Sequence, residues 1–331
     1  MDKTKIRKIL VISLSNIGDV VLTFPVLDIL KRDFPKAQIS VVVGPKAKGL
    51  LYSNPNFHHI YIFNKHQPWL SSARWILKLL KTRYDLVVDL RNTMIPLFIA
   101  PRYMTPLWRR RVGRCLHVRD EHLNRLKSIY PYRNISNTRY SLFITEKDSS
   151  YIKNLLNNEF KDSDNRYIIV SPGAADKSKR WGYNRFAELC DKIINIYNIK
   201  VVLIGDAGED KNIVVKILKE MKAPAMDIAG KTSLIQLAEV IKNALLVITN
   251  DSAPMHLASY LNVPVLAIFG PTSPERYGPW SNNSSFIRNN ISCEKCKYPK
   301  SGLLHSCMDA ISVNSVFNMF KITADGVDFI N

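Results

Sequence analysis

Two stretches of the sequence alternate short β-branched runs with amphipathic segments of helical length, and this alternation restricts the fold more than any other feature. Such alternation is typical of βαβ units, in which helices connect the parallel strands of a sheet. In the first stretch the expected strands are Ile9–Ser13, Ile39–Val43, His59–Phe63 and Leu86–Asp89, and the expected helices are Asp19–Phe34 and Trp69–Lys81. In the second stretch the expected strands are Tyr167–Val170, Lys200–Ile204, Leu245–Thr249 and Val265–Phe269, and the expected helices are Tyr183–Ile196, Asp210–Met221 and Ser233–Asn243. The sequence therefore predicts an α/β protein of two doubly wound domains.

The boundary between the two domains is expected where a polar, turn-prone run, Asp162-Ser163-Asp164-Asn165, precedes a new strand. We place the domains at residues 1–155 and 156–331, and a chain of 331 residues is long enough to give each a core. Residues 101–139 show no clean period and are rich in arginine, so we expect an irregular region there.

The positive charge of the chain is concentrated in its first half. Residues 1–140 hold 25 Lys and Arg against 8 Asp and Glu, whereas residues 141–331 hold 22 against 20. A basic face of this kind suits an anionic polymer, nucleic acid or the phosphate-rich surface of a membrane, although it also serves solubility alone. No helix-turn-helix, RNA-recognition or zinc-finger pattern accompanies the charge, so we do not expect nucleic acid as a partner.

The cellular compartment is predicted from the termini and the cysteines. The apolar run that ends at Ser13 is too short for a signal peptide, and no run approaches the roughly 20 apolar residues of a membrane span. Five cysteines, an odd number, argue against a disulfide scaffold. We therefore expect a cytoplasmic protein.

Polar loops follow the expected strands, and such loops line the ligand crevice of open α/β sheets. In the first half, Ser15-Asn16-Ile17-Gly18-Asp19 leads into a helix. Spacing alone leaves two roles open for Asp19, a helix cap and a catalytic carboxylate. In the second half, Lys179 follows Ser171-Pro172-Gly173-Ala174-Ala175 and either neutralises a phosphate or belongs to a solvated turn.

Two further loops of the second half carry candidate ligand contacts. Glu209 stands where an acid commonly accepts hydrogen bonds from ribose hydroxyls, and where it could simply begin a helix. In Asn250-Asp251-Ser252-Ala253-Pro254-Met255-His256 a strand passes into a helix, and the N–H groups of Ser252 and Ala253 would form an anion site. We expect loop hydrogen bonds to hold Asp251, and we expect packing to hold His256.

A cluster of soft ligands near the C-terminus, Cys293, Cys296, His305 and Cys307, is of the kind that holds a structural zinc. The spacing of the second pair is tighter than in most zinc knuckles. A structural zinc site and reduced thiols in a turn both stay open as interpretations.

Three motifs in one order make the chain resemble glycosyltransferase family 9, the ADP-heptose:lipopolysaccharide heptosyltransferases. The motifs are Ser15-Asn16-Ile17-Gly18-Asp19-Val20-Val21-x-Thr23-x-Pro25, Pro172-Gly173-Ala174 through Lys179-Arg180-Trp181, and Asn250 through Ala258 followed by Phe269-Gly270-Pro271-Thr272. The chain departs from the family in Ala253, where glycine is frequent, and in Gly182, where proline often follows the tryptophan.

The resemblance implies a GT-B fold, two Rossmann-like domains that face a cleft, with the acceptor on the first and the nucleotide sugar on the second. It places the catalytic carboxylate on Asp19 and assigns donor binding to Lys179, Glu209, Asp251, Ser252, Ala253 and His256. We assign acceptor binding to Asn16, Arg109, Arg110 and Arg111. We expect inverting transfer of a heptose or related sugar from an ADP-sugar, without a required cofactor. The expected acceptor is a phosphorylated, lipid-linked glycan of the lipopolysaccharide core, reached from an anionic membrane surface at the inner face of the cytoplasmic membrane.

Two other functions remain as alternatives at this stage. Another nucleotide-sugar transferase, an epimerase or a hydrolase of the same fold is one, since fold does not fix function. A nucleic-acid-binding protein is the other, on charge alone.

Overall fold

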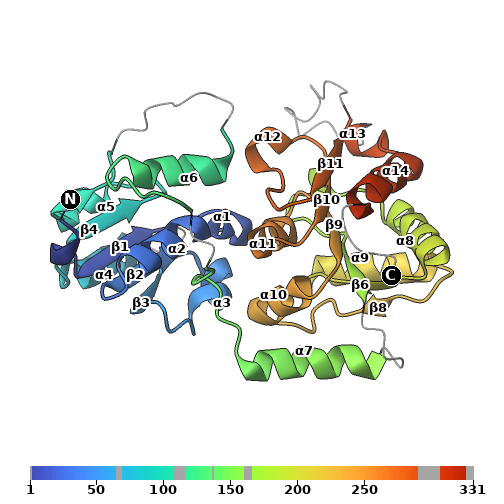
Figure 1. The fold of residues 1–331 in the computed structure, drawn as a ribbon, viewed down its shortest axis with the longest axis horizontal. Helices are drawn as coiled ribbons and strands as arrows, with labels where there is room; N and C mark the ends of the chain where they lie inside the picture. Colours follow the sequence, from blue (N-terminus) through green and yellow to red (C-terminus); the bar gives the residue numbers. More distant parts are fainter. Residues whose placement is uncertain are drawn as a thin grey trace. The chain divides into compact units, whose positions relative to one another are not determined.

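The computed structural model describes residues 2–64, 69–107, 116–135, 138–159, 166–289 and 306–325. It divides the chain into two compact units, unit 1 at Met1–Phe143 and unit 2 at Ile144–Asn331. Each unit contains its own parallel sheet (Figure 1). The two α/β domains predicted from the alternation of elements are therefore confirmed.

Unit 1 is built on a five-stranded sheet of order β3-β2-β1-β4-β5, in which every described pair of neighbours is parallel. Its strands are β1 (Lys8–Ile12), β2 (Gln38–Val43), β3 (His59–Ile62), β4 (Leu86–Asp89) and β5 (Tyr103–Met104). Its helices are α1 (Ile17–Val21), α2 (Phe24–Asp33), α3 (Lys48–Leu51), α4 (Trp69–Leu80), α5 (Ile95–Ile99) and α6 (Val118–Lys127), with short 3₁₀ turns η1 (Lys3–Lys5) and η2 (Pro45–Ala47). The chain starts at the centre of the sheet, winds outwards to β3 and then crosses to β4.

The strands of unit 1 are apolar at consecutive positions because helices cover both faces of a parallel sheet. Residues Ile9–Ile12 of β1 are buried throughout. On one face, Leu10 and Val87 pack with Leu79 of α4 and Ile95 of α5.

The single helix predicted at Asp19–Phe34 is wrong, because two helices, α1 and α2, occupy that range. Pro25 stands in the first turn of α2 and has no N–H with which to continue the hydrogen bonds of α1. The buried Thr23 hydroxyl lies at the break, where it donates to the Val20 carbonyl at 2.7 Å.

The prediction that residues 101–139 are irregular is wrong for Val118–Lys127, which forms α6. The His117 imidazole caps this helix by accepting from the backbone N–H of Arg119. Val118, Leu123 and Leu126 are buried, while most of the other side chains are polar. The apolar stripe is too narrow to stand out in the sequence.

Unit 2 is built on a six-stranded parallel sheet of order β11-β10-β9-β6-β7-β8. Its strands are β6 (Tyr167–Ser171), β7 (Lys200–Leu203), β8 (Met226–Asp227), β9 (Leu246–Asn250), β10 (Val265–Phe269) and β11 (Ser285–Arg288). Its helices are α7 (Glu146–Glu159), α8 (Tyr183–Tyr197), α9 (Glu209–Glu220), α10 (Leu234–Lys242), α11 (Ala253–Leu261), α12 (Pro274–Tyr277), α13 (Ser306–Asp309) and α14 (Val313–Ala324), with the 3₁₀ turn η3 (Lys177–Lys179). Ser233 and Gln236 form a capping box at the start of α10, with both reciprocal hydrogen bonds present.

The core of unit 2 joins the middle strands to α8 and to the C-terminal helix α14. Trp181 lies in this core, packs edge-on against Phe186 at 4.9 Å between ring centres, and donates from Nε1 to the Ile311 carbonyl. Because Trp181 is anchored in this way, the two residues before it, Lys179 and Arg180, are fixed at the end of the sheet.

The helix α7 belongs to unit 2 because it packs against α10 (Figure 1). Tyr151 of α7 donates to the Lys231 carbonyl at 2.9 Å, which adds a second tie to the same unit. The structure divides the chain between Phe143 and Ile144, ahead of this helix, whereas the expected boundary at residue 155 falls within it.

Candidate active site

The candidate donor site of unit 2 lies at the carboxyl ends of its central strands. The loops after β6, β7, β9 and β10 all leave the same edge of the sheet because these strands are parallel and adjacent. These loops carry the second and third sequence motifs. The tertiary structure thus brings together in one unit the segments predicted to bind the nucleotide sugar.

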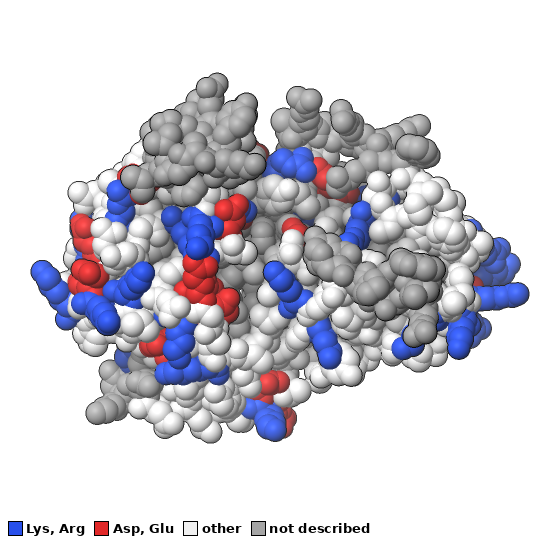
Figure 2. Space-filling model, turned by 180° about the vertical axis from the view of Figure 1, so that it is seen from behind, with Lys and Arg blue, Asp and Glu red and all other residues white. Residues whose placement is uncertain are grey.

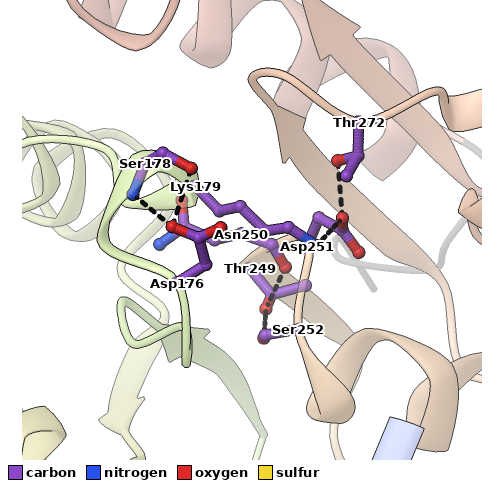
Figure 3. Close-up of polar contacts among 8 residues, drawn as sticks. All are labelled: Asp176, Ser178, Lys179, Thr249, Asn250, Asp251, Ser252 and Thr272. Carbon is purple, nitrogen blue, oxygen red and sulfur yellow. Dashed lines mark hydrogen bonds and ion pairs between the residues drawn. The ribbon is translucent and has the colours of Figure 1, made fainter. Parts of the chain in front are cut away.

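An ion pair between Lys179 and Asp251 is the centre of this site (Figure 3). The Lys179 Nζ lies 2.7 Å from Asp251 Oδ2, and the Thr272 hydroxyl donates to the same oxygen at 2.6 Å. Asp251 is 5% exposed at its side chain and Lys179 is 25% exposed. Asp251 therefore anchors a lysine that still reaches solvent. The hydrogen bond from Thr272 agrees with the expectation that loop hydrogen bonds hold Asp251.

Asn250 connects two of the loops through both ends of its amide. Its Nδ2 donates to the Pro172 carbonyl at 2.7 Å, and its Oδ1 accepts from the backbone N–H of Trp181. Asn250 is buried, so these bonds hold the loop after β6 against the loop after β9. The spacing of Lys179 from the N-terminus of α11 is set by this bridge.

The N-terminus of α11 supplies candidate donors for an anion. Ser252 is the N-cap, and Pro254 stands in the first turn without an N–H. The backbone N–H groups of Ser252 and Ala253 have no partner within the described part of the chain, and the Ser252 hydroxyl pairs with that of Thr249 (Figure 3). Free N–H groups and the helix dipole favour negative charge at this point.

Glu209 begins α9, and two cations surround it. Arg180 contacts it at 2.7 Å and 3.0 Å, and Lys177 contacts it at 3.2 Å. Hydrogen bonds from Arg180 and then from Lys177 lower the pKa of Glu209 to about 2, so the carboxylate is ionised at physiological pH. Arg180 also donates to the Ala174 carbonyl, which ties Glu209 to the motif after β6.

Asp210, the next residue along α9, fills the space that two glycines leave. A Cβ on Gly173 would lie 2.1 Å from its carboxylate, and a Cβ on Gly205 would lie 2.6 Å from its Cβ. A side chain at position 205 would therefore clash with the Asp210 Cβ, whereas one at position 173 would require the Asp210 carboxylate to move. Burial raises the pKa of Asp210 above its ordinary value.

Sequence reasoning assigned no role to Arg180 or Thr272, which the structure adds to the site. Both residues belong to the sequence motifs, but a motif does not show which other side chains they contact. His256 is buried in α11 and stacks on Trp280 at 5.8 Å between ring centres, which agrees with the expected packing role.

In unit 1, Asp19 lies half-buried in the first turn of α1 and accepts a hydrogen bond from Asn16 Nδ2 at 2.9 Å. Asn16 is the N-cap residue, and its side chain makes no capping hydrogen bond. Gly44 lies against this loop, since a Cβ there would be 2.5 Å from the Ser15 Cα. Asp19 is thus held by a side chain of its own loop.

Several predicted residues lie outside the described residues, namely Arg109, Arg110, Arg111, Cys293, Cys296 and His305. Cys307 is described and is buried in the core of unit 2. Within the described ranges, no group of three or more His, Cys, Asp or Glu is placed to hold a metal ion. The structural zinc site stays a prediction.

The parts of the chain that the structure describes include no helix with both the length and the apolar character needed to cross a membrane.

Comparison with known proteins identifies the family. Residues 73–305 match glycosyltransferase family 9 (heptosyltransferase). Lipopolysaccharide heptosyltransferase 3 of Escherichia coli is 26% identical over 291 residues, which cover 80% of this chain and 83% of that protein. The structure of E. coli ADP-heptose lps heptosyltransferase II superposes with a TM-score of 0.73 at 25% identity, over 96% of this chain and 99% of that one. A glycosyl transferase family 9 protein from Veillonella parvula shares the fold with a TM-score of 0.76 at 22% identity, over 96% and 97% of the two chains.

The fold is therefore GT-B, with two Rossmann-like domains, and the protein is a glycosyltransferase. The match spans more than half of the chain and includes the loops that carry Lys179, Glu209 and Asp251. This chain belongs to glycosyltransferase family 9, the heptosyltransferases.

Proposed function

We propose that this enzyme transfers a heptose from ADP-heptose to an acceptor sugar of a lipopolysaccharide core. The observation that carries the proposal is the family match together with the Lys179–Asp251 pair beside the N-terminus of α11. The relatives with related sequences are lipopolysaccharide heptosyltransferases, and one solved relative is described as an ADP-heptose enzyme.

The diphosphate of the donor binds, in this proposal, to the Lys179 ammonium and to the N–H groups of Ser252 and Ala253. A nucleoside diphosphate gains negative charge on its bridging oxygen as the sugar leaves. Fixed donors and a lysine held by Asp251 stabilise that charge without reorganising, which is the usual origin of electrostatic catalysis. Glu209, ionised and held by Arg180, accepts hydrogen bonds from the ribose hydroxyls.

Asp19 is the proposed general base, and Asn16 holds its carboxylate in place. The acceptor hydroxyl gives its proton to Asp19 while its oxygen bonds to the anomeric carbon, and the bond to the ADP oxygen breaks. A single displacement of this kind inverts the anomeric configuration. Its transition state has oxocarbenium character, so the Asp19 charge assists it as well. The acceptor is expected to contact Asn16 and the arginines at 109–111.

The transfer is proposed to need no metal ion, because Lys179 and the α11 N-terminus supply positive charge at the diphosphate. The sequence does contain one Asp-x-Asp triplet, Asp162-Ser163-Asp164, a motif that can hold a divalent cation. It falls in residues 160–165, outside the described residues. Unchanged transfer in excess EDTA is the expected result, and loss of transfer that Mg²⁺ or Mn²⁺ restores would contradict it.

Peripheral attachment to the inner face of the cytoplasmic membrane is proposed from the charge of the first half of the chain. Residues 1–140 carry 25 basic and 8 acidic side chains. Figure 2 shows basic and acidic side chains mixed over unit 2, at the left, and mainly basic ones among the coloured residues of unit 1, at the right. Binding to anionic liposomes should weaken as salt rises, because exposed charges are screened within about 8 Å at physiological ionic strength.

Product analysis tests the proposed reaction and its alternatives. The enzyme is incubated with ADP-heptose and a core oligosaccharide that lacks the heptose, and products are read by mass spectrometry and by the anomeric coupling in NMR. The expected product gains one heptose with inverted configuration. Free heptose formed without acceptor indicates a hydrolase, and an altered nucleotide sugar indicates an epimerase. Either result, with no acceptor product, overturns the proposal.

The role of Asp19 is tested by Asp19→Asn, which keeps the side-chain shape but removes the base. We expect a loss of kcat of about 10²–10⁴-fold, the usual contribution of a general base, with ADP binding unchanged. Transfer at the wild-type rate under saturating substrates would refute this role.

A further inference from the structure

A polar pocket of about 130 Å³ lies at the amino ends of the unit 1 strands. Its lining includes the first residues of three adjacent parallel strands, Lys8, Gln38 and His59. Asp19 lies beyond the carboxyl end of β1, at the opposite edge of the sheet. A strand of five residues separates the two edges by roughly 16 Å. The pocket is therefore distinct from the loop to which we assign acceptor chemistry.

The lining of this pocket is rich in hydrogen-bond donors. Its other residues are Ser40, His58, Tyr61, Thr82 and Tyr84, and none of the described residues that line it is acidic. Ser40 and Tyr84 are buried and form the closed part of the pocket, whereas Lys8 and both histidines are exposed. Burial raises the pKa of Tyr84, so its hydroxyl stays protonated, and it donates to the Tyr61 hydroxyl at 3.4 Å.

Positive charge gathers around His59. The Lys78 ammonium lies 6.0 Å from the centre of the Tyr61 ring, and that ring contacts the His59 imidazole at 4.2 Å between centres. Burial first, and then the charges of Lys78 and His58, lower the pKa of His59. An anion in the pocket would offset the repulsion between protonated His59 and the charges of Lys78 and His58, because none of the described lining residues carries a carboxylate.

We propose that this pocket is a binding site for a single phosphate group, held by Lys8, His58 and His59 with hydroxyl donors behind them. The volume falls below the roughly 300–1,000 Å³ of pockets that enclose drug-sized ligands, so a nucleotide does not fit. Two sources share the chemistry: the headgroup of an anionic phospholipid and a soluble phosphate ester. The site lies at the opposite edge of the unit 1 sheet from Asp19, and it does not depend on the proposed reaction.

The test follows the ring signals of His58 and His59 by NMR in the full-length enzyme, and the His58 signals alone report on His59→Gln. Inorganic phosphate is titrated against the wild type, against Lys8→Gln and His59→Gln, and against Lys219→Gln, which removes one exposed charge from unit 2. We expect saturable shifts of His59 and a higher titration midpoint, because a bound anion favours its protonated form. Each pocket variant should bind phosphate about tenfold more weakly, equivalent to about 1.4 kcal/mol, whereas the control should bind as the wild type does.

Two results would overturn the site. One is a wild-type His59 signal that responds neither to phosphate nor to phosphatidylglycerol vesicles. The other is binding that the two pocket variants leave unchanged, which would place the phosphate elsewhere. The wild-type titration decides the question even if a variant fails to fold.

The two sources are separated by comparing vesicles with soluble ligands. Co-sedimentation with phosphatidylglycerol vesicles that falls in Lys8→Gln but not in Lys219→Gln supports a lipid headgroup. Equal sedimentation of both variants, with glycerol phosphate shifting His59 in the wild type, supports a soluble phosphate ester.

Discussion

The ion pair of Lys179 and Asp251 offers a direct measurement of how the donor site is held together. Its two charges lie 2.7 Å apart at the ends of two different loops, and the sequence separates them by 72 positions. The perturbation is a double-mutant cycle of Lys179→Met and Asp251→Asn. Asparagine keeps an oxygen that can accept from the Thr272 hydroxyl, so the cycle isolates the charge.

The expected magnitude follows from burial. Removing one partner of a fully buried ion pair costs about 3–5 kcal/mol, because the other charge loses its counter-charge without regaining water. Asp251 is 5% exposed, so Lys179→Met should approach the lower end of that range. Lys179 is 25% exposed and recovers part of its hydration, so Asp251→Asn should cost less, about 2 kcal/mol. The double variant leaves no unpaired charge, and we expect a coupling free energy of about 2 kcal/mol.

Native-state hydrogen exchange is the suitable assay, because a chain of two units need not unfold in one step. The opening free energy is read from peptides that cover β6 and β9, the strands that carry the two loops. Lys219→Met serves as a control for the loss of an exposed lysine in the same unit. A coupling free energy below about 0.5 kcal/mol, the level found for independent sites, would refute the buried pair.

Three further measurements follow from the site. Glu209→Gln should weaken ADP binding about tenfold by calorimetry, because a hydrogen bond to a charged group is lost. The ratio of the ADP affinities of the wild type and Glu209→Gln should stay constant from pH 5 to pH 8, because Arg180 and Lys177 keep Glu209 ionised down to about pH 2. A ratio that changes across this range would contradict the ion pairs of Glu209 with Arg180 and Lys177. Asp210→Asn should be more stable relative to the wild type at pH 7 than at pH 4, since a carboxyl with a raised pKa binds its proton more tightly when folded and costs stability as pH rises through that pKa; chemical unfolding at both pH values measures this, and an equal difference in the free energy of unfolding at pH 4 and pH 7 would disprove it. Ser233→Ala should destabilise the start of α10 by about 1 kcal/mol, and unchanged exchange of the α10 amides would show that the capping box with Gln236 contributes nothing.

The sequence by itself determined the class of fold and the location of the ligand-binding loops. Buried parallel strands must be apolar at nearly every position, which is why β4 and β10 were predicted with the bounds that they have in the structure. Loops that follow such strands gather at one edge whatever the order of the strands. The resemblance to glycosyltransferase family 9 assigned Lys179 and Ser252 to one donor site, and their loops leave the same edge of the unit 2 sheet.

Helices with weak local signals could not be predicted from the sequence. The polar helix α6 has a narrow buried stripe. The expected boundary at residue 155 falls within α7, whose place depends on its packing against α10. The break between α1 and α2 rests on Pro25 and on the buried contacts of Thr23.

The partners of each charge were decided only by the tertiary structure. Asp251 meets Lys179 and Thr272, and Arg180 meets Glu209, because β9 lies between β6 and β10 and β7 lies beside β6. That order is a property of the whole sheet. The local sequence gives each side chain its chemistry, but it does not specify which loops become neighbours.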